Sequence, residues 1–393
     1  MNPNPHAILA AMIFAFPTMS SAEGNGDWCS GLRGVGKIHS DPENAYFQSL
    51  TLFARLHYQA DHIDGDDNLG NSFQNSSDNY RRARVGAKAD FLRLFSVKAV
   101  IDLVNDNRFR GAELDWGYRR FDSATLTFDL AEAFQIGSLD ALALTYGRHV
   151  FILTSEMATS SNLIMTIERS AIANKVHNDA RPTGFSVQAE KDGWFVTAAI
   201  FSSEDDSEFI GGFNDGIAYY AAVDRTVSKN LSFHLDAVVN DTSTGDDDII
   251  GYDWASSFNV IWDDEPYGVL TALVLGDNGA LPGGTGGAFH GFTVMPWFWI
   301  APEKLQAVFQ YSFSGSDEDS GIRTNARYLA ASQNIASVNS GRGDELHTFY
   351  LGLNHHFCGD NLKLMGGIEY ASLETPGGMV GALTYSIAAR VFF

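Results

Sequence analysis

The stretch that ends the chain, residues 381–393 (GALTYSIAARVFF), places the strongest constraint on the fold. Counting back from Phe393, every second residue is apolar, and the residues between are mostly small or polar. A period of two over this length predicts a β-strand with one apolar and one more polar face. An open sheet would expose this strand as a sticky edge. The pattern therefore favours a closed transmembrane barrel, in which this strand pairs with the first strand and Phe393 joins the interfacial aromatic girdle; the alternative is a soluble β-sandwich.

Composition fits many strands better than a helical protein. The chain is rich in Gly, Phe and Tyr, and no apolar run beyond the N-terminus reaches the ~18 residues of a membrane helix. Alternation dilutes the apolar residues of a lipid-facing barrel, which explains a moderate overall hydrophobicity. The formal net charge of −22 argues against a nucleic-acid partner, because no basic stripe is available to neutralise phosphates.

The N-terminus has the pattern of an export signal. Residues 7–16 (AILAAMIFAF) form a short apolar core, and a small-residue triplet ending in Ala22 follows. We expect cleavage after Ala22. Residues 1–22 are then a signal peptide, residues 23–46 a periplasmic stub and residues 47–393 the transmembrane barrel. The alternative is a buried first helix.

The sequence contains two cysteines, Cys29 and Cys358. An exported protein permits a disulfide between such a pair. The strand order given below puts both on the periplasmic side, one before the first strand and one in the last turn. A bridge that ties the stub to the base of the barrel is one reading, and two free thiols are the other.

From Tyr46 onward, alternating strands are separated in turn by short connections and longer polar loops. We predict about sixteen antiparallel strands of about ten residues, with about seven short turns on the periplasmic side and about eight longer loops outside. The first two strands are expected over residues 48–61 and 80–90, with a polar loop over residues 62–79 between them. Acidic residues in the long loops indicate either plain solvation or an anionic mouth that binds divalent ions near lipopolysaccharide.

The predicted inward faces are polar, and a barrel of about sixteen strands leaves an aqueous channel, whereas one of about eight strands is filled by side chains. The sequence therefore predicts an outer-membrane diffusion channel for small hydrophilic solutes, surrounded by lipid and lipopolysaccharide. No cofactor or metal is expected. The alternative is a non-conducting barrel that anchors acidic surface loops.

The third outer loop, residues 151–183, is partly apolar, which suits packing against an inner wall better than exposure to solvent. We expect this loop to fold into the lumen and constrict it; the alternative is an external loop that shields a subunit interface. The residues expected at the constriction are Glu156, Thr159, Ser160, Ser161 and Glu168.

Strand parity also predicts a strip of positive side chains on the inner wall. In a narrow pore a few cations are enough to set the sign of the permeant ion, although Asp102 and Glu168 oppose them. A single bulge would reverse any one of these orientations. The predicted strip consists of Arg82, Arg84, Lys88, Lys98 and, from the loop, Arg169.

Three patches of the sequence resemble the phosphate-selective porin O and P family. They are YRRARVGAK (residues 80–88), EMATSSNLIMTIERS (residues 156–170) and the tail segments LMGGIEYASL (residues 364–373) and ARVFF (residues 389–393). The resemblance implies a homotrimer of sixteen-stranded barrels with a folded-in third loop and a basic interior that selects anions such as phosphate. This chain has 26 basic against 48 acidic residues, so the residues that line its pore decide the sign of its selectivity.

Catalytic signatures are weak. The sequence contains no Gly-x-Ser-x-Gly, Walker or His-Glu-x-x-His motif. His355 and His356 are neighbours, but adjacent residues of a strand point to opposite faces and rarely chelate one metal. His234 and His347 have no serine at a supporting spacing. We therefore expect no enzymatic activity.

Overall fold

The computed structural model describes residues 27–108, 112–203, 208, 213, 216–241, 249–324 and 336–393. The predicted signal peptide, residues 1–22, lies outside the described residues. Among the described helices, none is both long and apolar enough to cross a membrane.

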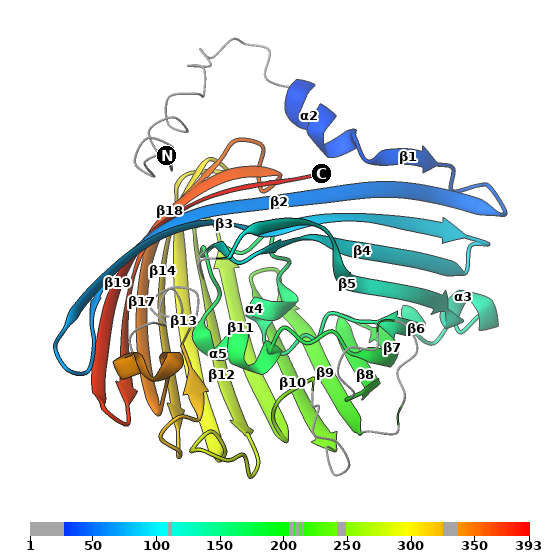
Figure 1. Cartoon of the computed structure of the whole chain (residues 1–393). Helices are drawn as coiled ribbons and strands as arrows, with labels where there is room; N and C mark the ends of the chain where they lie inside the picture. The colour runs from blue at the N-terminus through cyan, green and yellow to red at the C-terminus, as the bar shows by residue number, and fades with distance from the viewer. Residues whose placement is uncertain are drawn as a thin grey trace.

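Sixteen antiparallel strands form one closed sheet, in which β19 returns to pair with β2 (Figure 1). This arrangement confirms the predicted all-β barrel and its strand number. The strands are β2 (Phe47–Asp66), β3 (Ser72–Phe91), β4 (Phe95–Asp106), β5 (Leu114–Asp129), β6 (Ala141–Arg148), β7 (Thr183–Lys191), β8 (Trp194–Ser202), β9 (Ile217–Ser228), β10 (Leu231–Asp241), β11 (Trp254–Asp264), β12 (Tyr267–Asp277), β13 (Ala288–Ala301), β14 (Leu305–Ser316), β17 (Glu345–His356), β18 (Leu362–Thr375) and β19 (Gly378–Phe392).

The connections alternate between the two ends of the barrel. Seven of those between the described strands lie at the end where Phe393 is found, here called the short-turn end, and eight lie at the opposite end. The remaining elements are α2 (Asp27–Gly34) and β1 (Lys37–Ser40) before the barrel, α3 (Leu130–Phe134) between β5 and β6, α4 (Ser155–Ala158) and α5 (Ala171–His177) between β6 and β7, and β15 (Ile322–Arg323), η2 (Ala336–Gly341) and β16 (Arg342–Gly343) between β14 and β17.

The two faces of the sheet differ in polarity, as β17 illustrates. Its outward residues Leu351 and Leu353 are 60% and 50% exposed, whereas Tyr350 and Asn354 on the inward face are buried. An apolar outer face and a polar inner face are the pattern of a transmembrane barrel, because hydrocarbon surrounds the sheet and water enters its interior.

The first two strands are longer than the sequence pattern predicted. β2 and β3 each have 20 residues, so the loop expected over residues 62–79 shrinks to residues 67–71. The added outward side chains are polar and pair across the strands, as in the 2.7 Å hydrogen bond between His62 Nδ1 and Ser76 Oγ. The apolar alternation stops there, whereas the backbone ladder continues, and the prediction therefore ended both strands too early.

The N-terminal segment extends the seam at which the barrel closes. Phe393 exchanges backbone hydrogen bonds with Ala54 of β2, at 3.3 and 3.2 Å. Beyond that point β1 takes over the free edge of β2, with Lys37 opposite Thr51. A disulfide joins Cys29 of α2 to Cys358 in the turn between β17 and β18. The segment is thus fastened to the short-turn end on both sides of the closing strand.

Reducing this disulfide is expected to destabilise the barrel. The bridge spans 329 residues of sequence, and a crosslink over a long loop limits the freedom of the unfolded chain. Its loss should cost about 2–4 kcal/mol of unfolding free energy. The measurement is the temperature at which the folded band in detergent gels converts to the unfolded band, with and without reductant. A Cys29→Ser/Cys358→Ser variant, which reductant cannot affect, is the control; an unchanged temperature after verified reduction would contradict the expectation.

Candidate functional site

A cavity of about 750 Å³ lies between the inner faces of β3, β4 and β5 and the connection from β6 to β7, residues 149–182, here called the long loop. Twelve arginine and lysine side chains line this cationic cavity against five carboxylates, in a chain that has 26 basic and 48 acidic residues. The lining is therefore charged oppositely to the protein as a whole. The basic residues are Arg55, Arg81, Arg82, Arg84, Lys98, Arg119, Arg120, Arg169, Lys175, Arg181, Arg323 and Arg342, and the acidic ones are Asp102, Asp106, Asp122, Glu168 and Asp179.

Strand β3 contributes three of the arginines. Arg84 lies opposite Arg55, and Arg82 lies opposite His57, so both line the cavity as strand parity predicted. The register shifts at the next residue, and this bulge brings Arg81 into the lining as well. Its Nε lies 2.9 Å from Oε1 of Glu168 in the long loop. Alternation alone places Arg81 outward, which is why the sequence did not reveal it.

The other residues of the predicted strip occupy different positions. Lys98 lines the cavity, whereas Lys88 is outside it and forms an ion pair with Asp90 at 3.3 Å. Arg169 borders the cavity but donates to its own loop, from Nε to the Glu156 carbonyl at 2.6 Å. Burial lowers the pKa of Arg169 to about 10. It adds positive charge and also braces the loop.

Four of the five residues expected at the constriction, all except Glu156, border the cavity. Glu156 is instead buried within the loop, where its Oε1 accepts from the Ser170 amide at 3.1 Å. The same oxygen accepts from Nε2 of Gln310 on β14 at 3.0 Å. Glu156 therefore holds the fold of the loop, whereas Thr159 and Ser160 border the cavity with partly open side chains and Ser161 and Glu168 border it with buried ones.

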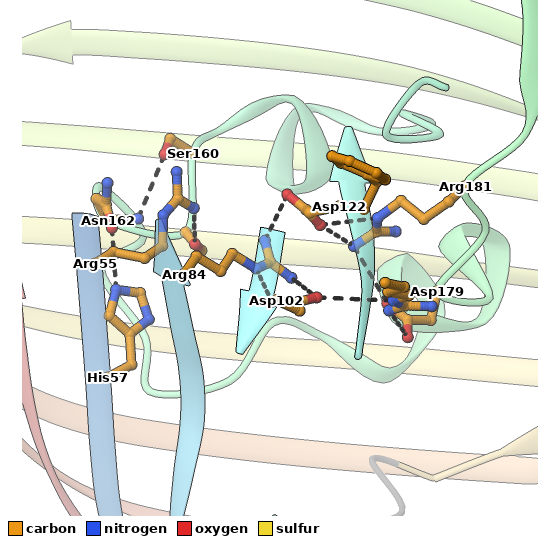
Figure 2. A network of polar contacts seen from close by, with 12 residues as sticks. Arg55, His57, Arg84, Asp102, Asp122, Ser160, Asn162, Asp179 and Arg181 are labelled. Carbon is orange, nitrogen blue, oxygen red and sulfur yellow. Dashed lines mark hydrogen bonds and ion pairs between the residues drawn. The ribbon is translucent and has the colours of Figure 1, made fainter. Parts of the chain in front are cut away.

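A network of ion pairs ties the long loop to the cationic wall (Figure 2). Arg84 contacts Asp102 and, through Nη1, Oδ2 of Asp122 at 2.8 Å. The other oxygen of Asp122 accepts from Arg181 Nε at 2.9 Å. Asp122 of β5 thus bridges an arginine of β3 and an arginine of the long loop, and it holds both guanidinium groups in place.

A second carboxylate, Asp179, completes this network. It contacts Arg120 of β5 and lies 3.3 Å from Nη2 of Arg181. The side chain of Asp179 is 58% exposed, and the guanidinium groups of Arg181 and Arg120 hold its pKa well below the usual range. Asp179 and its neighbour Asn178 both have positive φ, at 54° and 46°, a conformation that Asn and Asp tolerate better than most residues.

Other cations of the cavity have no acidic partner. Arg55, Lys98 and Arg119 form no ion pair with any carboxylate in the part of the chain that the structure describes. Arg55 donates to Ser161 Oγ at 2.7 Å, and the side chains of Lys98 and Arg119 are exposed. The Nη1 atom of Arg82 is buried and has no hydrogen-bond partner among the described residues. Arg55, Lys98 and Arg119 therefore line the cavity without an ion pair among the described residues, whereas the Arg82 atom is closed to solvent.

Two buried cations of the last strands hold the middle of the long loop. Arg390, only 1% exposed, donates from Nη2 to the Ile167 carbonyl at 2.6 Å and from Nη1 to the Ile164 carbonyl at 3.3 Å. Lys363 donates to the same Ile164 carbonyl at 3.0 Å. Parity places both side chains inward, but the sequence carries no signal for the carbonyl groups that they meet.

The start of the long loop is held from another part of the sheet. Asp236 of β10 accepts from the Thr154 amide at 2.9 Å, and Asn259 of β11 accepts from the Ser155 amide at 2.9 Å. Thr154 has a φ of 83°, which is rare for a β-branched residue, so these contacts fix a strained backbone. The long loop is therefore hydrogen-bonded to two separate parts of the barrel wall, β10 and β11 at its start and β18 and β19 at its middle.

The described residues contain no group of three histidine, cysteine or acidic side chains placed to hold a metal ion. His356 is buried on the inner face of β17, and its neighbour His355 is exposed. The pair points to opposite faces, as strand geometry requires.

A closed barrel of sixteen strands with a charged, water-accessible interior belongs to the class of outer-membrane porins. Residues 51–248 match the family model of the phosphate-selective porins O and P, and the chain belongs to this family. The family and the barrel fold accordingly point to an outer-membrane channel. No curated protein matches the sequence.

Solved porin structures share the fold at low sequence identity. A loop L8 deletion mutant of OmpT from Vibrio cholerae aligns with a TM-score of 0.59 at 12% identity, over 89% of this chain and 100% of that chain. The channel DcaP of Acinetobacter baumannii aligns with a TM-score of 0.58 at 11% identity, over 88% and 97%. An anion-selective porin from Comamonas acidovorans aligns with a TM-score of 0.56 at 14% identity, over 88% and 99%.

Replacing Arg390 with methionine is expected to loosen the long loop. The substitution removes the donor of the Ile167 carbonyl, whereas the Ile164 carbonyl keeps its bond from Lys363, and an unsatisfied buried group costs about 1–3 kcal/mol. Single channels in a planar bilayer should show larger current fluctuations, and the folded band should convert at a lower temperature. Arg93→Met in the short turn between β3 and β4, where the guanidinium lies 3.9 Å from Glu43, is the matched control. Quiet, wild-type-like currents from Arg390→Met would refute the anchoring role.

Proposed function

We propose that this protein is an anion-selective porin that passes small hydrophilic anions, including oxyanions of the size of phosphate, by passive diffusion. The observation that carries the proposal is the excess of twelve basic over five acidic side chains around the cationic cavity. A low-dielectric wall strengthens such a field, so the lining controls which ions enter even when the whole chain is acidic.

We propose that the long loop lies across the lumen and forms its constriction. Its hydrogen bonds reach β2, β10, β11, β14, β17, β18 and β19, which together occupy much of the closed sheet. Figure 1 draws α4 and α5 within the ring of strands. These contacts leave the cationic cavity on one side of the loop, bounded by β3, β4 and β5.

The two groups of cations in this cavity have different proposed roles. Arginine binds an oxyanion through two parallel hydrogen bonds, which gives geometric selectivity. Arg55, Lys98 and Arg119, which have no acidic partner among the described residues, contact the permeating anion. Carboxylates hold Arg84, Arg120 and Arg181 in place. These three arginines therefore contribute to the electrostatic potential of the cavity without binding the anion directly. Attraction without tight capture is what conduction requires.

The cellular setting belongs to the same proposal. Residues 1–22 are an export signal, residues 23–46 lie at the periplasmic mouth, and residues 47–393 form the barrel in the outer membrane. The barrel contacts lipid and lipopolysaccharide and assembles as a homotrimer; a trimer form is described for OmpT of Vibrio cholerae, which shares the fold with a TM-score of 0.56. Diffusion through the cavity uses no cofactor.

The reversal potential of the purified protein in a planar bilayer under a potassium chloride gradient tests the selectivity. Chloride should permeate better than potassium, because the lining is cationic. Replacing Arg55, Lys98 and Arg119 together with glutamine should reduce the anion-to-cation permeability ratio about three- to tenfold, in line with the strength of a few charges in a narrow pore. Inorganic phosphate added to the wild type should reduce the chloride current.

Lys88→Gln provides the matched control, because Lys88 lies on β3, one of the strands that bound the cavity, but is not among the residues that line it. Its permeability ratio should stay at the wild-type value. Cation preference in the wild type would contradict the selectivity, and an equal effect of Lys88→Gln would contradict the role of the cavity. A folded barrel without any conductance would instead favour the non-conducting anchor of acidic surface loops.

A further inference from the structure

A second, smaller hollow of about 300 Å³ lies on the inner faces of β9, β10 and β11, near their short-turn ends. It is here called the lower pocket. Ala158 and Thr159 of the long loop border both the lower pocket and the cationic cavity. The two hollows therefore border the same loop segment, and the lower pocket lies between that segment and the short-turn ends of β9, β10 and β11.

The lower pocket contains a histidine held between two carboxylates. His234 of β10 lies with Nδ1 2.6 Å from Oδ1 of Asp224 on β9 and with Nε2 2.6 Å from Oδ2 of Asp236. An ionised carboxylate only accepts hydrogen bonds, so both ring nitrogens must donate, and a ring with two N–H groups is the imidazolium cation. The geometry thus places one positive charge between two negative charges.

The two carboxylates differ in their access to solvent. The side chain of Asp236 is fully buried and also accepts from the Thr154 amide at 2.9 Å and from Ser257 Oγ at 2.6 Å. The side chain of Asp224 is 47% exposed and lines the pocket, and among the described residues its ion-pair partner is His234 alone. Loss of the imidazolium would therefore leave the Asp224 charge facing any solute in the pocket.

We propose that His234 determines anion selectivity at the exit of the pore, by cancelling the charge of Asp224 so that small anions leave the constriction through the lower pocket. The proposal rests on the proposed function of anion diffusion. Arg225 follows Asp224 on β9, but its guanidinium lies over the Trp194 ring on the other face of the strand, so the imidazolium of His234 is the positive charge that stands beside Asp224 and Asp236. Loss of the imidazolium makes the net charge of this group more negative by one, which repels an anion and attracts a cation.

His234 is also connected to the long loop through Asp236, which accepts hydrogen bonds from both His234 and the Thr154 amide. A change of charge and a shift of the loop have different signatures. The field of a charge is screened over about 10 Å at 0.1 M salt but over about 3 Å at 1 M salt. An electrostatic role therefore shows in the permeability ratio at low salt, whereas a displaced loop changes the conductance at both salt concentrations.

The test replaces His234 with glutamine and measures reversal potentials in potassium chloride gradients at low and high ionic strength. The anion-to-cation permeability ratio near 0.1 M salt should fall about two- to fivefold, with little change near 1 M, because the added net charge is screened there. The single-channel conductance at 1 M should stay close to the wild-type value. The double variant Asp224→Asn/His234→Gln should regain the wild-type ratio, because it no longer carries the uncompensated charge.

The matched control is His355→Gln, the same chemical change at an exposed outward position near the short-turn end of β17. It should leave the ratio unchanged. An anion-selective wild type with an unaltered His234→Gln ratio overturns the role of His234 and leaves the proposed function intact. A ratio that falls equally at both salt concentrations and is not regained in the double variant also overturns it, since the loop has then moved. A cation-selective wild type would contradict the proposed function, and with it the role of His234.

Discussion

The hydrogen bonds from Arg390 to the carbonyls of the long loop are the contacts on which the interior of this barrel depends. A loop packed against the inner wall buries backbone groups that water can no longer satisfy, and each of them needs a partner. The strands supply these partners from distant places, with Arg390 and Lys363 for the carbonyls and Asp236 for an amide. Because Arg390 and Lys363 donate, and Asp236 accepts, as charged groups, these bonds are stronger than neutral ones and fix where the loop lies.

The position of the loop in turn sets the electrostatics. It brings Arg169, Arg181 and Asp179 to the wall formed by β3, β4 and β5, where Asp122 and Asp179 hold three arginines. The basic residues that remain without an acidic partner then face open space. A chain with a net charge of −22 can therefore contain a positively charged cavity, because the potential inside a cavity depends mainly on the residues that line it.

Much of the fold was predictable because closure of the barrel follows from the period of two and from the alternation of short and long connections. Parity also placed Arg82, Arg84 and Lys98 on the correct face. It failed for Arg81, because a bulge shifts the register by one residue, and it ended β2 and β3 too early, because the outward residues there are polar. The partners that strand side chains find in the long loop, such as the Ile167 carbonyl for Arg390, were not predictable. Strand periodicity predicts which face of the sheet a side chain is on, but not which residue of another segment it will contact.

Bromide can locate the pathway directly, because it replaces chloride and scatters anomalously. Crystals of the protein soaked in bromide would be measured at the bromine absorption edge, with a rubidium soak as the comparison for cations. If the cavity is the anion pathway, bromide peaks lie beside Arg55, Lys98 and Arg119 and rubidium peaks are absent there. Rubidium between these side chains, or bromide found only on the outer surface, would contradict the central claim.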